Sequence, residues 1–101
     1  MAQGTGDPCS GPLKPQRAKR LILEILKSGV TTASPHALDE MAKDDLSMVD
    51  CVNVLRAGVV EVPELERSSW RYRVRTPQIF VVVAFRSMTE IVIVTAWRVK
   101  R

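Results

Sequence analysis

A row of three arginines is the part of this sequence best suited to chemistry. Arg71, Arg73 and Arg75 alternate with other residues within the segment Ser69–Arg75, and successive side chains of a β-strand point to opposite faces. The three guanidinium groups are therefore expected on one face, about 7 Å apart along the strand. Guanidinium groups bind phosphate oxygens through paired hydrogen bonds, so the row predicts a surface for a polyanion. An edge strand that carries charge only for solubility is the simpler alternative.

The same alternation puts Trp70, Tyr72 and Val74 together on the other face. Tyr72 lies between two arginines in the sequence, and such neighbours could lower the pKa of its phenol and make it a proton-transfer group. A core tyrosine with a hydrogen-bonded hydroxyl is the alternative. The catalytic candidates on this strand are Arg71, Tyr72 and Arg73, and Arg73 is favoured because it is central in the row.

Two further catalytic candidates lie outside this strand. His36 is expected at the second position of a helix that begins after Ser34. A helix N-terminus disfavours positive charge, so the imidazole would act there as a neutral general base. A solvated histidine on the polar stripe with Glu40 and Lys43 is the alternative. Thr95 interrupts an apolar strand near the end of the chain, and it is either a reactive hydroxyl or an ordinary strand residue.

More cations follow the arginine row. Arg86 and Arg98 are expected at strand ends, where they either extend the cationic surface or serve solubility. Together with Arg75 and Lys100 they form the predicted set for binding RNA. Trp97 is predicted to belong to the core, and a platform on which bases stack is the alternative.

The positive charge of the chain is concentrated in its second half. The net charge is +4, and residues 59–101 hold eight basic and four acidic residues, whereas residues 1–58 are balanced. After Arg67 only one acidic residue remains. A basic element on one side of a small protein indicates a polyanion such as nucleic acid, or an acidic partner.

Composition argues against several other classes. A hydrophobic content of 46% predicts a folded chain. Two cysteines, Cys9 and Cys51, and one histidine predict neither a disulfide framework nor a metal site. No apolar run is long enough for a membrane helix, and the first residues lack the pattern of a signal peptide. We therefore expect a cytoplasmic protein that needs no cofactor and does not bind a membrane.

Three helices are predicted before the strands. Residues 1–13 contain three glycines, two prolines and no apolar period, so we expect a disordered leader before a single domain of residues 14–101. The first helix is bounded by Pro15 and Gly29. The second begins after Ser34, runs to about residue 43 and is expected to turn Leu38, Met41 and Ala42 inward.

The third helix is predicted to begin at a capping box. Ser47 and Asp50 have the spacing of this motif, with Asp in place of Glu. Gly58 ends the helix, and beyond it the apolar period changes from 3.6 to 2, which is typical of strands.

The strands are predicted at residues 59–62, 69–75, 78–86 and 90–99, with residues 64–68 as a connection. The last two strands are apolar on both faces, which indicates that both faces are covered. Residues 30–32 are β-branched or apolar and predict at most one bridge of sheet. The fold class is therefore α+β, with three N-terminal helices followed by an antiparallel meander of about four strands.

Several segments together resemble the MqsR-like toxins and a related uncharacterised family, within the RelE-type group of ribonucleases that includes barnase-like, EndoU-like and colicin-like folds. The resemblance extends over about residues 18–101. It includes Arg20-Leu21 at a helix start, Lys27-Ser28-Gly29-Val30 at its end and Asp50-Cys51-Val52-Asn53-Val54 in the third helix. Trp70 at a strand start, the His36-Ala37 pair and an apolar last strand with a basic end complete it.

The resemblance implies a type II toxin, a metal-independent endoribonuclease that makes the ribose 2′-OH attack the adjacent phosphate. It also implies mRNA as substrate, with or without the ribosome, and a zinc-finger or helix-turn-helix antitoxin as partner. The sequence departs from the family in three places. Arg71 stands where the family has glutamine, Phe80 stands where it has tyrosine, and no lysine of a Lys-Ser-Met-Thr run occurs in residues 64–68. The terminal lysine is matched by Arg98 or Lys100.

Two alternatives to a nuclease stay open. One is a module of the same fold that binds nucleic acid or a partner without cutting. The other is a structural oligomer, such as a homodimer, that would use the two strands with two apolar faces as its interface.

Overall fold

A computed structural model describes residues 7–100, in which three helices pack on a six-stranded mixed sheet. The predicted α+β class is confirmed, and the sheet has more strands than the expected four. No helix of these residues is long and apolar enough to cross a membrane. The elements are α1 (Pro15–Ser28), β1 (Val30–Ala33), α2 (Pro35–Lys43), α3 (Met48–Ala57), β2 (Val59–Val60), β3 (Glu64–Glu66), β4 (Ser69–Arg75), β5 (Ile79–Ser87) and β6 (Glu90–Arg98).

The helix boundaries follow the predicted capping residues. The hydroxyl of Ser34 accepts a hydrogen bond from the backbone N–H of Ala37 at 3.0 Å, which caps α2. The predicted capping box of α3 is confirmed, because Ser47 and Asp50 each accept a hydrogen bond from the other's backbone N–H. The Ser47 N–H also holds the pKa of the Asp50 carboxyl below its ordinary value.

The strand order is β1-β6-β5-β4-β2, and β3 pairs with β4 off this path. β2, β4, β5 and β6 are the four predicted antiparallel strands. β1 is a strand of four residues that runs parallel to β6. It is longer than the single bridge that was expected here. A parallel partner requires a crossover, which the chain makes by returning through α2, α3 and the meander.

Residues 64–68 are not the expected connection. Glu64–Glu66 form β3, which pairs antiparallel with the start of β4. The two-residue turn between them has positive φ at both Arg67 (51°) and Ser68 (67°), as in the tight turns that join hairpin strands. Sequence patterns missed this hairpin because such turns normally contain Asn or Gly, and neither residue is present here.

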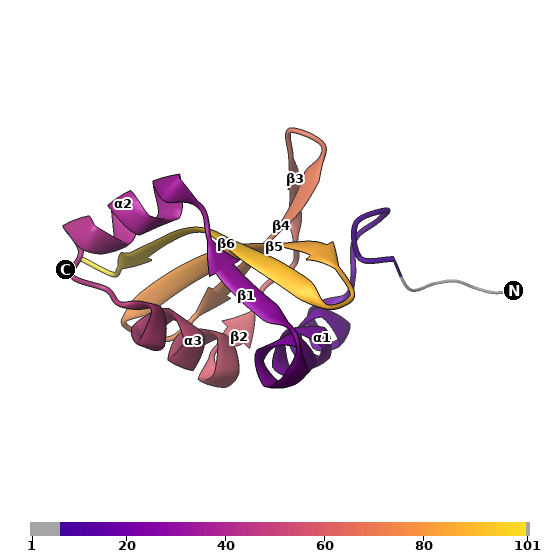
Figure 1. Ribbon diagram of the computed structural model, residues 1–101, viewed down its shortest axis with the longest axis horizontal. Helices are drawn as coiled ribbons and strands as arrows, with labels where there is room; N and C mark the ends of the chain where they lie inside the picture. The colour runs from indigo at the N-terminus through magenta and orange to yellow at the C-terminus, as the bar shows by residue number, and fades with distance from the viewer. Residues whose placement is uncertain (1–6, 101) are drawn as a thin grey trace, which may run out of the picture.

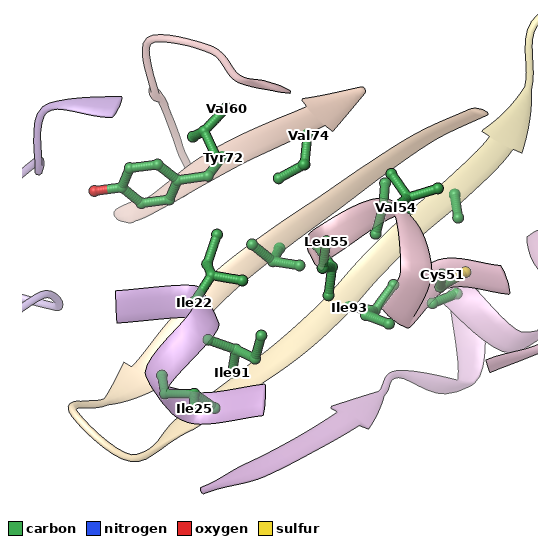
Figure 2. Close-up of a cluster of buried hydrophobic side chains, with 14 of the residues drawn as sticks. Ile22, Ile25, Cys51, Val54, Leu55, Val60, Tyr72, Val74, Ile91 and Ile93 are labelled. Atoms are coloured by element: carbon green, nitrogen blue, oxygen red, sulfur yellow. The ribbon is translucent and has the colours of Figure 1, made fainter. Parts of the chain in front are cut away.

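The core lies between one face of the sheet and helices α1 and α3 (Figures 1 and 2). From β4 it takes Tyr72 and Val74, both fully buried, so the predicted alternation of this strand is confirmed. On α2 the inward residues are Ala37 and Met41, while Leu38 is 50% exposed. Ala42 is exposed as well, so the expectation that Leu38 and Ala42 face inward was wrong. The largest fully buried side chains of the helices and of β5 and β6 are Ile22, Ile25, Cys51, Leu55, Val81, Val83, Ile91 and Ile93.

The opposite face of the sheet is covered by no helix of the described residues. Figure 1 shows α1 and α3 on one side of the sheet, while α2 and the β3–β4 hairpin project toward the other side. α2 packs against β6 rather than across the sheet. On this uncovered face Val82 and Val94 are only half-buried, whereas Ala84 and Val92 are buried. We call this surface the open face.

Residues 7–13 differ from the disordered leader that was expected. Pro8 is fully buried, the Cys9 thiol donates a hydrogen bond to the carbonyl of Phe85 at 3.0 Å, and the Leu13 N–H donates to the hydroxyl of Tyr72 at 2.7 Å. This segment therefore packs at the end of the sheet. The rest of the expected leader, residues 1–6, lies outside the described residues.

Lys19 joins two helices in a way that the sequence pattern did not indicate. It leaves α1 and its ammonium donates hydrogen bonds to the carbonyls of Leu55 (3.1 Å), Arg56 (2.7 Å) and Gly58 (2.7 Å). These carbonyls end α3, where the helix dipole is negative and carbonyls lack helical partners. Lys19 is thus the C-terminal cap of α3.

We expect Lys19→Met to lower the free energy of unfolding by about 2 kcal/mol, because hydrogen bonds to a charged donor contribute about that much. Urea denaturation followed by circular dichroism would measure it. Lys27→Met is the matched control, since Lys27 is an exposed lysine of the same helix. Equal stabilities of the two variants would contradict the capping role.

Candidate nucleic-acid interface

The arginine row lies on the open face. Because Tyr72 and Val74 are buried under α1 and α3, the alternate residues Arg71, Arg73 and Arg75 project from the other side of β4. Arg73 and Arg75 expose 44% and 45% of their side chains, whereas Arg71 exposes 23%. The predicted cationic surface is therefore present and accessible.

Pairing across the strands places one predicted catalytic residue, Thr95, on the same face as the row. Arg73 is opposite Val82, and Val82 is opposite Thr95. Thr95 thus lies on the open face with the arginines. It is half-buried, and β5 separates its strand from β4. A bulge in β6 at Val94 shifts the register between Val82 and Val83, and without this shift Thr95 would turn to the core.

An aromatic pair lies beside the row on the same face. Arg75 is opposite Phe80 and Phe80 is opposite Trp97, and the two rings stack with centroids 5.1 Å apart and planes 7° apart. The guanidinium of Arg73 lies 5.8 Å from the centroid of Phe80. Trp97 was predicted to belong to the core; its half-buried ring is instead part of the open face, as the stacking alternative required.

Acidic residues that are remote in sequence neutralise part of the row. The Glu61 N–H donates to the Arg73 carbonyl at 2.9 Å, and this places its carboxylate 2.7 Å from Nε of Arg75 and 3.7 Å from Nη1 of Arg73. Glu66 at the hairpin lies 3.6 Å from Nη1 of Arg71. The excess of positive charge seen along the sequence is therefore smaller in space, because the β2–β3 segment folds beside β4.

Tyr72 does not take part in the candidate site. It is fully buried on the core face, its hydroxyl accepts a hydrogen bond from Leu13, and its ring packs edge-on against Phe85. Burial raises the pKa of its phenol, which is the opposite of the shift expected from the neighbouring arginines. The core alternative holds because the strand alternation turns those guanidinium groups away from the ring.

His36 is an exposed residue at the second position of α2, as predicted. It interacts electrostatically with Glu40 one turn later, on the polar stripe of the helix. No hydrogen bond joins it to the arginine row within residues 7–100. The interaction of His36 seen in this part of the chain is therefore with its own helix, and its catalytic role stays a prediction.

Arg98 and Lys100, which were predicted to bind RNA, both contact the α2–α3 loop. Nε and Nη2 of Arg98 donate to the carbonyls of Asp44 and Asp45 at 2.8 and 3.1 Å, and its N–H donates to the Asp44 carboxylate at 2.7 Å. The Lys100 ammonium pairs with the same carboxylate at 3.1 Å. Both cations tie the end of β6 to the α2–α3 loop.

A hollow of about 380 Å³ opens at the other end of the face. Arg71 and Arg86 line it together with Ser34 at the start of α2 and Ser69 at the start of β4. Arg86 thus joins the row, as expected of it. The floor is formed by the apolar residues Ala84, Phe85, Val92 and Val94.

Sequence reasoning missed Phe80 and Glu61 as site residues. Phe80 could have been found, because Phe80 and Trp97 are about equally far from the turn that joins β5 and β6. Residues so placed in a hairpin lie opposite each other. Glu61 carries no such signal, since its contact depends on how β2 pairs with β4. No three His, Cys, Asp or Glu side chains of residues 7–100 gather in a way that would hold a metal ion.

Comparison of the chain with protein-family models, curated proteins and solved structures finds no match. The resemblance to the MqsR-like toxins therefore stays a prediction from the residues that carry it. What the chain does must be argued from the geometry of the open face.

The anchor around Asp44 gives a pH-dependent prediction. The backbone N–H of Arg98, and then Lys100, hold the pKa of the Asp44 carboxyl below its ordinary value. A pKa lowered by folding stabilises the protein above the pKa of the unfolded chain, and this contribution is lost as the pH falls through the folded value. We expect the urea midpoint to fall below about pH 4, and Asp44→Asn to weaken that dependence.

The control is Asp39→Asn, which changes an exposed carboxyl of α2. Asp50 will keep part of the acid response in both variants because its pKa is also lowered. If Asp44→Asn showed the full acid sensitivity of the unmodified chain, the anchor would not have this role.

Proposed function

We propose that the open face binds single-stranded RNA. The observation that carries the proposal is the coexistence, on one uncovered sheet face, of the arginine row with the stacked pair Phe80–Trp97. Stacking platforms beside cationic side chains are the means by which sheet proteins hold unpaired bases and their phosphates. A row of charge needed only for solubility would not require half-buried aromatic rings next to it.

The aromatic pair favours single strands over duplex. Bases of a duplex are stacked on each other and present only their edges in the grooves, whereas unpaired bases expose their ring faces. The open face is a sheet surface bordered by α2 and the β3–β4 hairpin (Figure 1). An unpaired RNA strand can lie across this surface between the two borders.

We expect the protein to bind an unstructured oligoribonucleotide with an affinity that falls as salt rises, because arginine contacts release counterions from phosphates. Trp97→Leu should weaken binding about 5- to 150-fold, since stacking contributes roughly 1–3 kcal/mol per base. Fluorescence anisotropy over a salt series would measure both effects.

Trp70→Leu is the matched control. Trp70 lies on the core side of the sheet, opposite to the open face, and packs against the core. It should change stability and leave RNA affinity unaltered. Equal losses of affinity in the two tryptophan variants would show that the effect comes from the fold, and a duplex bound more tightly than the single strand would refute the proposal.

Cleavage of the bound RNA is a second candidate function, favoured by the position of Glu61. Its carboxylate contacts Arg75 at 2.7 Å and Arg73 at 3.7 Å. A carboxylate could take the proton of a ribose 2′-OH while the guanidinium groups stabilise charge on the attacked phosphate. This reading includes the RelE-like toxin assignment, an antitoxin partner, and Thr95 and His36 as further candidates.

In this reading the purified protein should release fragments with 2′,3′-cyclic phosphate ends in the presence of EDTA. Glu61→Gln should lower the rate about 10²- to 10⁴-fold, the usual contribution of a general base, and should retain RNA binding. Mass spectrometry of the products with anisotropy on the same preparations would measure both. If the protein bound RNA and released no fragments, cleavage would be refuted and RNA binding would remain as the proposed function.

A further inference from the structure

The four arginines of the open face differ in how they are engaged. Arg73 and Arg75 share the carboxylate of Glu61, and Arg73 also lies over the ring of Phe80. A phosphate would have to displace the Glu61 carboxylate before it could contact both groups. The middle of the row is therefore the less available part for an anion.

Arg71 and Arg86 are less engaged by acidic side chains. Arg86 is exposed and has no ion pair within residues 7–100. The pair of Arg71 with Glu66 is long, at 3.6 Å, and Glu66 is 65% exposed, so water screens it. Nε of Arg71 donates to the Ser69 hydroxyl at 3.4 Å, which leaves its other guanidinium nitrogens for an anion.

These two arginines line one hollow of about 380 Å³. The hydroxyl of Ser69 also borders it, as does Ser34 at the N-terminal end of α2, where the helix dipole favours negative charge. The volume is sufficient for a phosphate group with part of its sugar. The other residues that line the hollow are apolar.

We infer that this hollow is a phosphate-binding site, in which Arg71 and Arg86 hold one phosphate group of the bound RNA strand. The inference rests on the proposed function. It adds where one phosphate of the RNA lies on the open face and along which line the RNA strand runs. Ala84 at the floor of the hollow lies four residues from Phe80 on β5, about 13 Å along the strand. One end of the open face thus holds a phosphate and the other end stacks a base.

Arg86→Gln tests the site with little risk to the fold, because Arg86 is exposed. We expect roughly tenfold weaker binding of a single-stranded oligoribonucleotide at low salt. The slope of log affinity against log salt should fall by about 0.7, the value for one lost phosphate contact on a single strand. Arg71→Gln should have the same effect.

Arg56→Gln is the matched control, because Arg56 is an exposed arginine of α3 that pairs with Asn53. It should keep the affinity and the salt slope of the unmodified protein. Suppose that the unmodified protein binds RNA and that Arg86→Gln and Arg71→Gln also keep its affinity and its salt slope. The hollow would then not be the phosphate site, and the proposed function would still stand.

Oligonucleotides with a 5′-phosphate, with a 3′-phosphate or with neither distinguish the source of the phosphate. An affinity gain from one terminal phosphate that Arg86→Gln removes identifies a terminal group. An equal loss for all three oligonucleotides identifies a phosphodiester within the strand.

Inorganic phosphate separates this inference from the function on which it rests. We expect titration to shift the side-chain Nε–H resonances of Arg71 and Arg86 in ¹H–¹⁵N spectra, and to leave that of Arg56 in place. Should the unmodified protein bind no RNA, these shifts would still support an anion site in the hollow. Their absence would overturn it.

Discussion

The burial of Tyr72 and Val74 beneath α1 and α3 is the constraint on which the rest of the structure depends. A strand cannot turn these two side chains inward without turning their neighbours outward, so the core contact decides where the guanidinium groups of β4 lie. The hydroxyl of Tyr72 extends the same contact to Leu13 and holds the segment before α1 against the sheet. Packing on one face and charge on the other are therefore two consequences of one alternation.

The cations of the chain divide into those that hold the fold and those that face water. Lys19 caps α3 and Arg98 binds the α2–α3 loop, so their donors are used within the protein. Lys100 makes one ion pair with the same loop and stays largely exposed. The arginines of the open face remain partly or wholly available, and Glu61 distinguishes them further. Net charge alone overstates the cationic surface, because a donor that is already bonded to the chain is not free to form the same bond with a ligand.

The open face explains a conflict in the sequence, where β5 and β6 are apolar on both sides although the helices cover only one. Phe80 and Trp97 cover each other by stacking, and the long side chain of Arg73 extends over the Phe80 ring. Part of the burial on this face is thus supplied by the side chains of the face itself. Such a surface keeps its aromatic rings in place and still presents them to a ligand.

The sequence by itself determined the helices, the α+β class and the side of β4 on which the arginines lie, because caps and periods of 3.6 and 2 are local properties. Only the tertiary structure decided which charges are paired and which rings meet. The β3–β4 hairpin has a turn without Asn or Gly, β1 needs β6 as a distant partner, and Trp97 faces outward because of a bulge. These features depend on strand register, which arises from contacts between residues that are far apart in the chain.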